Sequence, residues 1–256
     1  MTDVVFINPA NSNEIYQSLS NEYSAIGTPY WALLLAESCR SKGYKVEIVD
    51  VLAEKLDDET FVKRIEEINP RLITFCVYGE NVNGGTPQME GAIRLSKLLT
   101  FGKPISFVGS HVQALPYKVL YEEESIDIVF TNEGVYSLWE ILKLPDIWDG
   151  YENVKGIGFR KDGKPFLNEP QKIVPQERMD IDLPGYAWDL LPYKEKPFDL
   201  YRSPMWHAEY DEEKRTPYAS IYTSLGCVFQ CEFCMINIIN RDDNEEIGVA
   251  GDYNKM

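Results

Sequence analysis

The sequence predicts an α/β protein, with a doubly wound parallel sheet over residues 1–145. Two observations support this prediction: five short apolar runs occur in this region, and helical patterns lie between them. The runs do not alternate strictly between apolar and polar residues, which is typical of strands buried on both faces of a parallel sheet. Strands that alternate with helices form such a sheet through right-handed crossovers.

Each predicted strand is a run of apolar residues that ends at a polar or turn residue. The five runs are Val4–Ile7, Val46–Val49, Leu72–Val77, Ile105–Val108 and Ile126–Phe130. We expect all five to be parallel, in the flavodoxin-like order 2-1-3-4-5.

Apolar residues at helical spacing predict the helices between these strands. Thr28 and Pro29 are typical of an N-cap and a first helical residue, and Gly43 is typical of the position just beyond a helix. Further apolar stripes predict helices over 61–68, 89–98, 119–120 and 138–142.

Small and polar residues follow the predicted strands at their carboxyl ends, where doubly wound sheets bind ligands. We expect seven of them to border one crevice: Pro9, Asn11, Tyr78, Gly109, Ser110, His111 and Glu133. The alternative is that these are ordinary turns between strand and helix, which need Gly and Asn in any case.

Residues 146–217 differ in character from the preceding region. Two apolar stretches around Asp162 and Gly163 predict a β-hairpin. The stretch 170–217 is rich in proline and aromatic residues but poor in Gly and Ser. We therefore expect an extended connector that packs across a domain surface rather than a flexible linker.

A strand-like run over 218–223 leads into three closely spaced cysteines, Cys227, Cys231 and Cys234. Three thiolates from one short loop can hold a 4Fe–4S cluster and leave its fourth iron open to a small molecule. A zinc site completed by a histidine and an unloaded loop are the alternatives. The other two cysteines, Cys39 and Cys76, are expected to be core residues.

The cysteine spacing, with an aromatic residue before the last cysteine, resembles the signature of the radical S-adenosylmethionine superfamily. The resemblance implies that the three thiolates hold the cluster and that its open iron chelates S-adenosylmethionine. It implies that an electron from the reduced cluster cleaves this molecule to methionine and a 5′-deoxyadenosyl radical. Phe233 would lie near the adenine.

The rest of the chain resembles the branch of that superfamily that carries an N-terminal cobalamin-binding domain. The matching stretches include 7–9, 27–30, 108–111, 132–134 and 182–192. The resemblance implies a cobalamin-binding domain over 1–145, a hairpin and connector over 146–217, and the start of a (β/α) barrel over 218–256. Base-off cobalamin proteins ligate cobalt through a histidine after the first strand. Residues 8–13 contain no histidine, so no lower ligand is expected from that loop.

We expect the barrel to be truncated, because 22 residues follow Cys234 and a complete barrel needs about 200 or more. The main functional hypothesis is a cobalamin-binding radical enzyme that catalyses methylation or rearrangement and is inactive as this chain alone. The alternatives are a non-catalytic cobalamin- or ligand-binding module with a vestigial cysteine loop, and a radical methylthiotransferase.

The composition limits the expected partners. The formal net charge of −16 disfavours direct contact with nucleic acid or anionic lipid. The longest apolar run, Trp31–Ala36, is too short to span a bilayer, and no signal peptide is visible. We therefore expect a cytoplasmic protein. Its expected partners are a substrate, either a small molecule or one of unknown kind, and an electron donor such as flavodoxin or ferredoxin.

Overall fold

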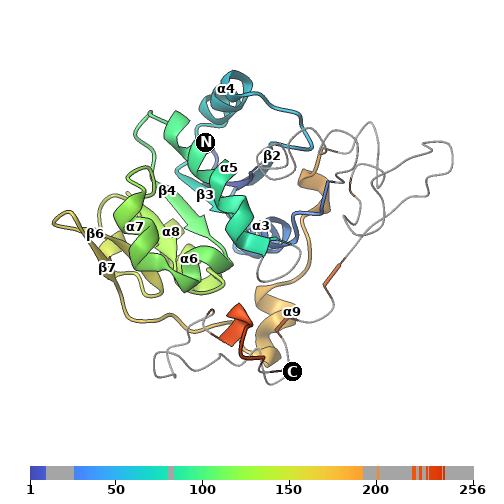
Figure 1. The fold of residues 1–256 in the computed structure, drawn as a ribbon. Helices are drawn as coiled ribbons and strands as arrows, with labels where there is room; N and C mark the ends of the chain where they lie inside the picture. Colours follow the sequence, from blue (N-terminus) through green and yellow to red (C-terminus); the bar gives the residue numbers. More distant parts are fainter. Residues whose placement is uncertain are drawn as a thin grey trace.

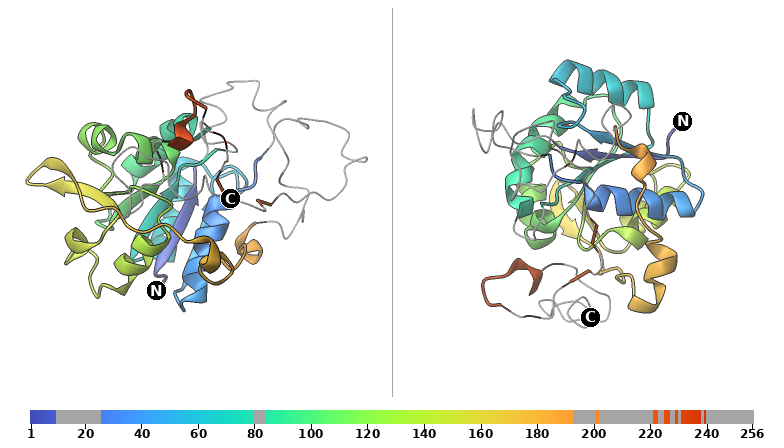
Figure 2. Two further views of the ribbon diagram at one scale, coloured as in Figure 1. Left: turned by 90° about the horizontal axis from the view of Figure 1, so that it is seen from below. Right: turned by 90° about the vertical axis from the view of Figure 1, so that its right-hand side faces the viewer.

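The computed structural model describes residues 1–9, 26–79, 84–192 and 201, and near the C-terminus 221–222, 225–226, 229, 231–237 and 239. The described residues form one seven-stranded sheet with helices on both faces (Figures 1 and 2). The α/β fold class expected from the sequence is confirmed.

The first five strands of the sheet are parallel. Their order is β2-β1-β3-β4-β5, as predicted. In the centre of the sheet Phe6 pairs with Ile48 on one side and with Thr74 on the other. The bounds are β1 Val4–Asn8, β2 Val46–Asp50, β3 Leu72–Cys76, β4 Ile105–Val108 and β5 Ile128–Phe130.

The predicted hairpin extends this sheet. Strand β6 (Ile157–Lys161) pairs antiparallel with β5, and β7 (Lys164–Leu167) pairs antiparallel with β6. Asp162 and Gly163 turn the chain with φ values of 51° and 74°, the left-handed pair that a two-residue hairpin turn requires. We expected the hairpin to belong to the connector. Its pairing instead satisfies the backbone groups along the outer edge of β5.

Five helices lie where the sequence predicts them, and the short helices α6 (Ser110–Ala114) and α9 (Met179–Asp182) were not predicted. Helix α3 (Tyr30–Ser41) begins one residue later than expected, because Pro29 is its N-cap, and Gly43 follows it with φ +88°. Asp57 caps α4 by accepting a hydrogen bond from the Thr60 N–H at 2.8 Å. The others are α4 Asp58–Ile68, α5 Gly85–Leu98, α6 Ser110–Ala114, α7 Pro116–Glu122, α8 Val135–Lys143 and α9 Met179–Asp182.

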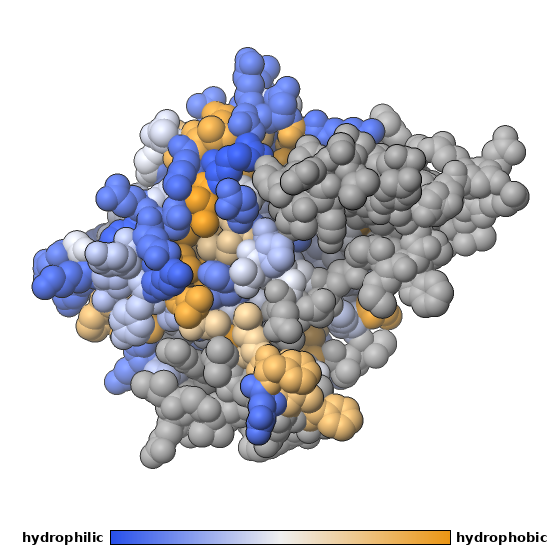
Figure 3. Space-filling model, viewed as in Figure 1, coloured by the Kyte–Doolittle hydropathy of each residue, from blue (hydrophilic) through white to orange (hydrophobic). Residues whose placement is uncertain are grey.

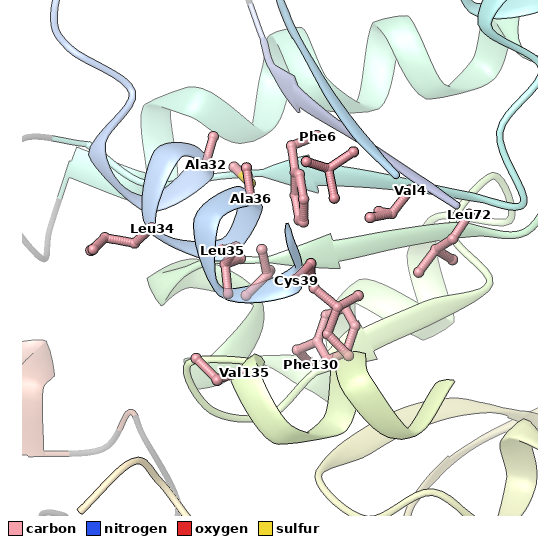
Figure 4. Packing of buried hydrophobic residues seen from close by; sticks show 14 of the residues in the cluster. Val4, Phe6, Ala32, Leu34, Leu35, Ala36, Cys39, Leu72, Phe130 and Val135 are labelled. Atoms are coloured by element: carbon pink, nitrogen blue, oxygen red, sulfur yellow. The ribbon is translucent and has the colours of Figure 1, made fainter. Parts of the chain in front are cut away.

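Two apolar layers hold the helices to the sheet. Val4 and Phe6 belong to the layer under α3 and α8, whereas Val5 and Ile7 belong to the layer under α4 and α5. This alternation follows from the two-residue period of a strand. Cys39 lies among the residues of the first layer (Figure 4). Cys39 and Cys76 are both buried core residues, as predicted, and burial raises the pKa of each thiol.

The described part of the connector packs against α3 and α8 through a buried carboxylate. Asp182 accepts hydrogen bonds from Tyr136 at 2.8 Å and from Arg178 at 2.8 and 2.9 Å, and it pairs with Lys42 at 3.2 Å. Burial alone would raise the pKa of Asp182, but the hydrogen bonds from these three donors lower it. The carboxylate is thus held ionised, and it joins two helices to the connector.

Parts of the outer surface are hydrophilic, and apolar residues are exposed between them (Figure 3). Figure 3 shows blue residues over α4 and over the β6–β7 hairpin in the view of Figure 1. Within the part of the chain that the structure describes, no helix is both long and apolar enough to cross a bilayer.

Candidate functional site

The structure brings six of the seven predicted crevice residues to one edge of the sheet. Tyr78 follows β3, Gly109 to His111 follow β4, and Glu133 follows β5. Strands β3, β4 and β5 are neighbours and parallel, so their carboxyl ends meet at one edge. Pro9 is buried just after β1, which pairs in parallel with the other side of β3, so Pro9 lies at the same edge. Asn11 lies outside the described residues.

A hydrogen-bonded chain links the ends of β3 and β5. The buried Gln113 amide of α6 donates to the Tyr78 hydroxyl at 2.7 Å and to the Asn132 carbonyl at 2.8 Å. The Asn132 amide donates in turn to the carbonyl oxygen of Gln171 in the connector at 2.7 Å. Burial raises the pKa of Tyr78 well above its usual range, so this hydroxyl stays protonated.

Glu133 is tied to both the connector and α3. The Val174 N–H donates to its Oε1 at 2.5 Å, and the Trp31 indole N–H donates to its carbonyl oxygen at 3.2 Å. The Trp31 ring also lies against Tyr78, with centroids 5.1 Å apart. Glu133 therefore connects the end of β5 with two segments far away in sequence.

Two buried hydroxyls at this edge have no hydrogen-bond partner among the described residues. They are Ser110 Oγ, at the start of α6, and Thr131 Oγ1, just after β5. Leaving a buried hydroxyl unpaired is costly, so these two groups need a partner that the described residues do not supply. Neutral donors and acceptors of this kind suit a ligand that carries amide groups.

The glycines of this edge serve backbone packing. A Cβ on Gly109 would lie 2.1 Å from the Val77 carbonyl oxygen, and one on Gly85 would lie 2.3 Å from Ser110 Oγ. Contacts this short do not occur, so both positions require glycine. Close backbone packing therefore explains the glycines at these two positions without a ligand, as the alternative of ordinary strand–helix turns expects.

His111 lies on α6 and contacts Thr86 of α5. Its Nδ1 is hydrogen-bonded with Thr86 Oγ1 at 3.0 Å. Partial burial, together with the nearby charge of Lys118, lowers the pKa of His111. The imidazole is therefore neutral at pH 7, with its Nδ1 engaged by Thr86.

The structure describes two of the three motif cysteines. Cys231 is exposed and Cys234 is partly buried, and the Cys234 N–H donates to the Cys231 carbonyl at 2.9 Å in a tight turn. Phe233, between them, is 85% exposed. Cys227 lies outside the described residues, and among those residues no three metal-binding side chains converge. The three-thiolate cluster thus stays a prediction.

Sequence reasoning missed Trp31, Gln113 and Thr86. Each of these side chains lies on a helix and is hydrogen-bonded to one of the predicted crevice residues. The partners are Glu133 for Trp31, Tyr78 for Gln113 and His111 for Thr86. Gln113 carried a usable signal, since a polar amide two residues after His111 is unusual on a short helix that packs on a sheet.

Comparisons with known proteins agree with this fold. Residues 18–142 match the family model of the B12 binding domain. The chain is 25% identical over 234 residues to an uncharacterized methyltransferase of Pyrococcus horikoshii, which covers 90% of this chain and 44% of that protein. It is 25% identical over 225 residues to the cytidylyl-2-hydroxyethylphosphonate methyltransferase of Streptomyces wedmorensis, covering 75% of this chain and 41% of that protein. The chain thus spans less than half the length of these curated relatives.

Solved structures share the fold. The cobalamin-dependent S-adenosylmethionine radical enzyme OxsB superposes with a TM-score of 0.51 in its form with aqua-cobalamin and S-adenosylmethionine bound, and 0.52 with aqua-cobalamin alone. In both forms the sequence identity is 15%, and the match covers 74% of this chain and 24% of that one. At this identity the likeness concerns the fold. The match of residues 18–142 to the B12 binding domain supports the N-terminal part of the resemblance seen in the sequence.

Proposed function

We propose that this chain binds cobalamin at the carboxyl edge of β3, β4 and β5 and holds a 4Fe–4S cluster on Cys227, Cys231 and Cys234. The protein would use both to transfer a methyl group to an unidentified substrate. The observation that carries the proposal is the order of two features in one chain. A B12 binding domain over 18–142 is followed by a cysteine motif with the spacing of a site-differentiated cluster.

The residues at the sheet edge support the cobalamin part of the proposal. The rim of a corrin ring carries neutral amide groups, which need hydrogen-bonding partners of both kinds. Ser110 and Thr131 offer hydroxyls that lack partners among the described residues. Trp31 and Tyr78 offer aromatic surface at the same edge, and Gln113 donates a hydrogen bond to the Tyr78 hydroxyl.

The chemistry of the cysteine turn supports the cluster part. Cys231 and Cys234 lie on one tight turn, and Cys231 is exposed, so a metal cluster can reach it without unfolding of the core. When bound, a reduced cluster supplies the electron that splits S-adenosylmethionine, and cobalamin supplies a carrier for a methyl group. The side chains of this chain would bind and orient the two groups.

Methyl transfer is preferred to rearrangement because both matched relatives carry the name methyltransferase. The substrate of the Streptomyces wedmorensis protein is not transferred to this chain, since the identity is low and the match covers part of that protein.

Anaerobic reconstitution tests the proposal. The chain is incubated with iron, sulfide and hydroxocobalamin, desalted, and analysed for iron, cobalt and its electron paramagnetic resonance spectrum. We expect about four irons and one cobalt per chain. Cys231→Ala should lose the iron signal and keep the cobalt, whereas Cys39→Ala, which removes a buried thiol elsewhere, should keep both. A parent chain that retains neither metal would contradict the proposal.

A further inference from the structure

The Tyr186 hydroxyl binds the backbone of Tyr222, which lies five residues before the first cysteine of the motif. The Tyr222 N–H donates to the Tyr186 hydroxyl oxygen at 2.9 Å, and this hydroxyl donates to the Tyr222 carbonyl at 3.1 Å. One tyrosine thus satisfies both backbone groups of Tyr222, as a neighbouring strand would do. Burial raises the pKa of Tyr186, so the hydroxyl keeps the proton that it donates.

The ring of Tyr222 is held from a second direction. It lies against the ring of Tyr30, with centroids 4.4 Å apart and an interplanar angle of 41°. Tyr30 is the buried first residue of α3, and its neighbour Trp31 donates to the Glu133 carbonyl at the sheet edge. Through Tyr30, Tyr222 is therefore connected to the edge at which the candidate cobalamin residues lie.

Tyr186 itself is mounted on the sheet domain. The adjacent Ala187 N–H donates to the Leu33 carbonyl of α3 at 3.3 Å. Arg40 of the same helix pairs with Asp189 at 2.6 Å, and the Tyr186 ring lies 5.2 Å from that of Trp188. Because these contacts fix Tyr186 on α3, its hydroxyl presents a fixed anchor to Tyr222.

The spacing along the chain limits how far the cysteines can lie from this anchor. Cys227 follows Tyr222 by five residues, which span about 17 Å at most when fully extended. Leu225 shortens the distance that the chain can span, since it packs against the apolar layer under α3. Gly226 then turns the chain with φ +93°, a value that favours glycine.

We propose that Tyr186, Tyr222 and Tyr30 form a clamp that positions the start of the cysteine motif beside the carboxyl edge of the sheet. The inference rests on the proposed function, in which this motif holds a cluster and the edge holds cobalamin. In that setting the three tyrosines are positioning residues. They set where the cluster stands relative to the cobalamin site, and they take no part in the chemistry.

The test removes only the anchoring hydroxyl. Tyr186→Phe keeps the ring against Trp188 and loses both hydrogen bonds to Tyr222. The matched control is Tyr44→Phe, which deletes a tyrosine hydroxyl just beyond the other end of α3, where it donates to the Trp139 carbonyl at 3.5 Å. Tyr222→Ala provides a second variant, because it keeps the backbone bonds and removes the ring that lies on Tyr30.

Two readouts are compared in the full chain: amide hydrogen exchange at Tyr222 and Leu225, and iron retained after anaerobic reconstitution and gel filtration. In Tyr186→Phe we expect amide exchange about tenfold faster, a clear loss of retained iron and an unchanged melting temperature. In Tyr44→Phe we expect amide exchange and retained iron to equal those of the parent chain. Exchange that is the same in Tyr186→Phe and the parent would overturn the clamp. A parent chain that takes up no iron would instead contradict the proposed cluster, while the exchange readout would still decide whether the anchor exists.

Discussion

Asp50 is the residue whose burial has the clearest consequence for pH dependence. It is fully buried at the end of β2, where it accepts hydrogen bonds from the Ala53 N–H at 3.1 Å and the Tyr201 hydroxyl at 3.0 Å. Burial raises the pKa of Asp50 to about 6, and the nearby charge of Glu54 adds to the increase. The hydrogen bonds oppose this increase but do not cancel it.

The raised pKa of Asp50 predicts a loss of stability as pH rises. A carboxyl group with a higher pKa in the folded state stabilises that state most when protonated. Its contribution is therefore complete below pH 3.8 and lost as pH rises towards 6. Asp50→Asn should remove this part of the pH dependence, which amounts to about 3 kcal/mol at most. Urea unfolding at pH 4.5 and 7.5 checks this, and an equal pH dependence in both proteins would contradict it.

Ser110 and Thr131 allow ligand binding to be separated from stability. Their hydroxyls are buried and lack partners among the described residues, so Ser110→Ala and Thr131→Val should leave the melting temperature unchanged or raise it. If these hydroxyls bind cobalamin, each substitution should weaken its affinity about five- to tenfold.

The control for these two substitutions is Ser137→Ala. The Ser137 hydroxyl donates to the Lys155 carbonyl at 2.8 Å, so its loss should lower the melting temperature and leave affinity unchanged. Calorimetry and a hydroxocobalamin titration measure the two quantities. Parent-like affinity in both Ser110→Ala and Thr131→Val would exclude these hydroxyls from the binding site.

At the scale of elements, the β6–β7 hairpin does more than extend the sheet. Arg160 of β6 donates to the carbonyl oxygens of Leu120, Glu124 and Ile126 at 3.1, 2.8 and 2.6 Å. These carbonyls lie in the last turn of α7 and in the loop that leads to β5. One guanidinium therefore satisfies groups that the end of a helix leaves unpaired.

Arg160→Met should accordingly destabilise the fold by about 2 to 3 kcal/mol, because several buried or partly buried carbonyls lose a charged donor together. Lys164→Met, an exposed cation on β7 of the same hairpin, should change stability by less than about 0.5 kcal/mol. Chemical unfolding of the two variants checks this. Similar stabilities would show that the hairpin's charge, and not its capping contacts, matters.

The strands of the sheet could be predicted from the sequence because each is a short apolar run. Four of the five parallel strands begin at the predicted residue, and β5 begins at Ile128 rather than Ile126. The hairpin was found, but its place in the sheet was not, since pairing with β5 is a long-range contact that leaves no local signal. For the same reason the contact of Trp31 with Glu133 could not be predicted.

At the scale of the whole molecule, the connector links the sheet edge to the cysteine motif. It contacts Glu133 through Val174, α3 and α8 through Asp182, and Tyr222 through Tyr186. The sequence predicted an extended connector packed on a domain surface. The described part of it runs from Glu133, one of the candidate cobalamin residues, to Tyr222.

Cobalamin binding by this chain, without a histidine ligand from the first loop, is the central claim. The 256 residues contain two histidines, His111 and His207, which are the two residues of this chain that could place an imidazole on cobalt. The most direct measurement is equilibrium dialysis against hydroxocobalamin, with absorption and electron paramagnetic resonance spectra of the bound corrinoid. We predict one corrinoid per chain, with the same spectra in the parent and in a variant that carries His111→Ala and His207→Ala. Failure of the parent chain to retain cobalamin, or a cobalt–imidazole signal that this variant abolishes, would contradict the account.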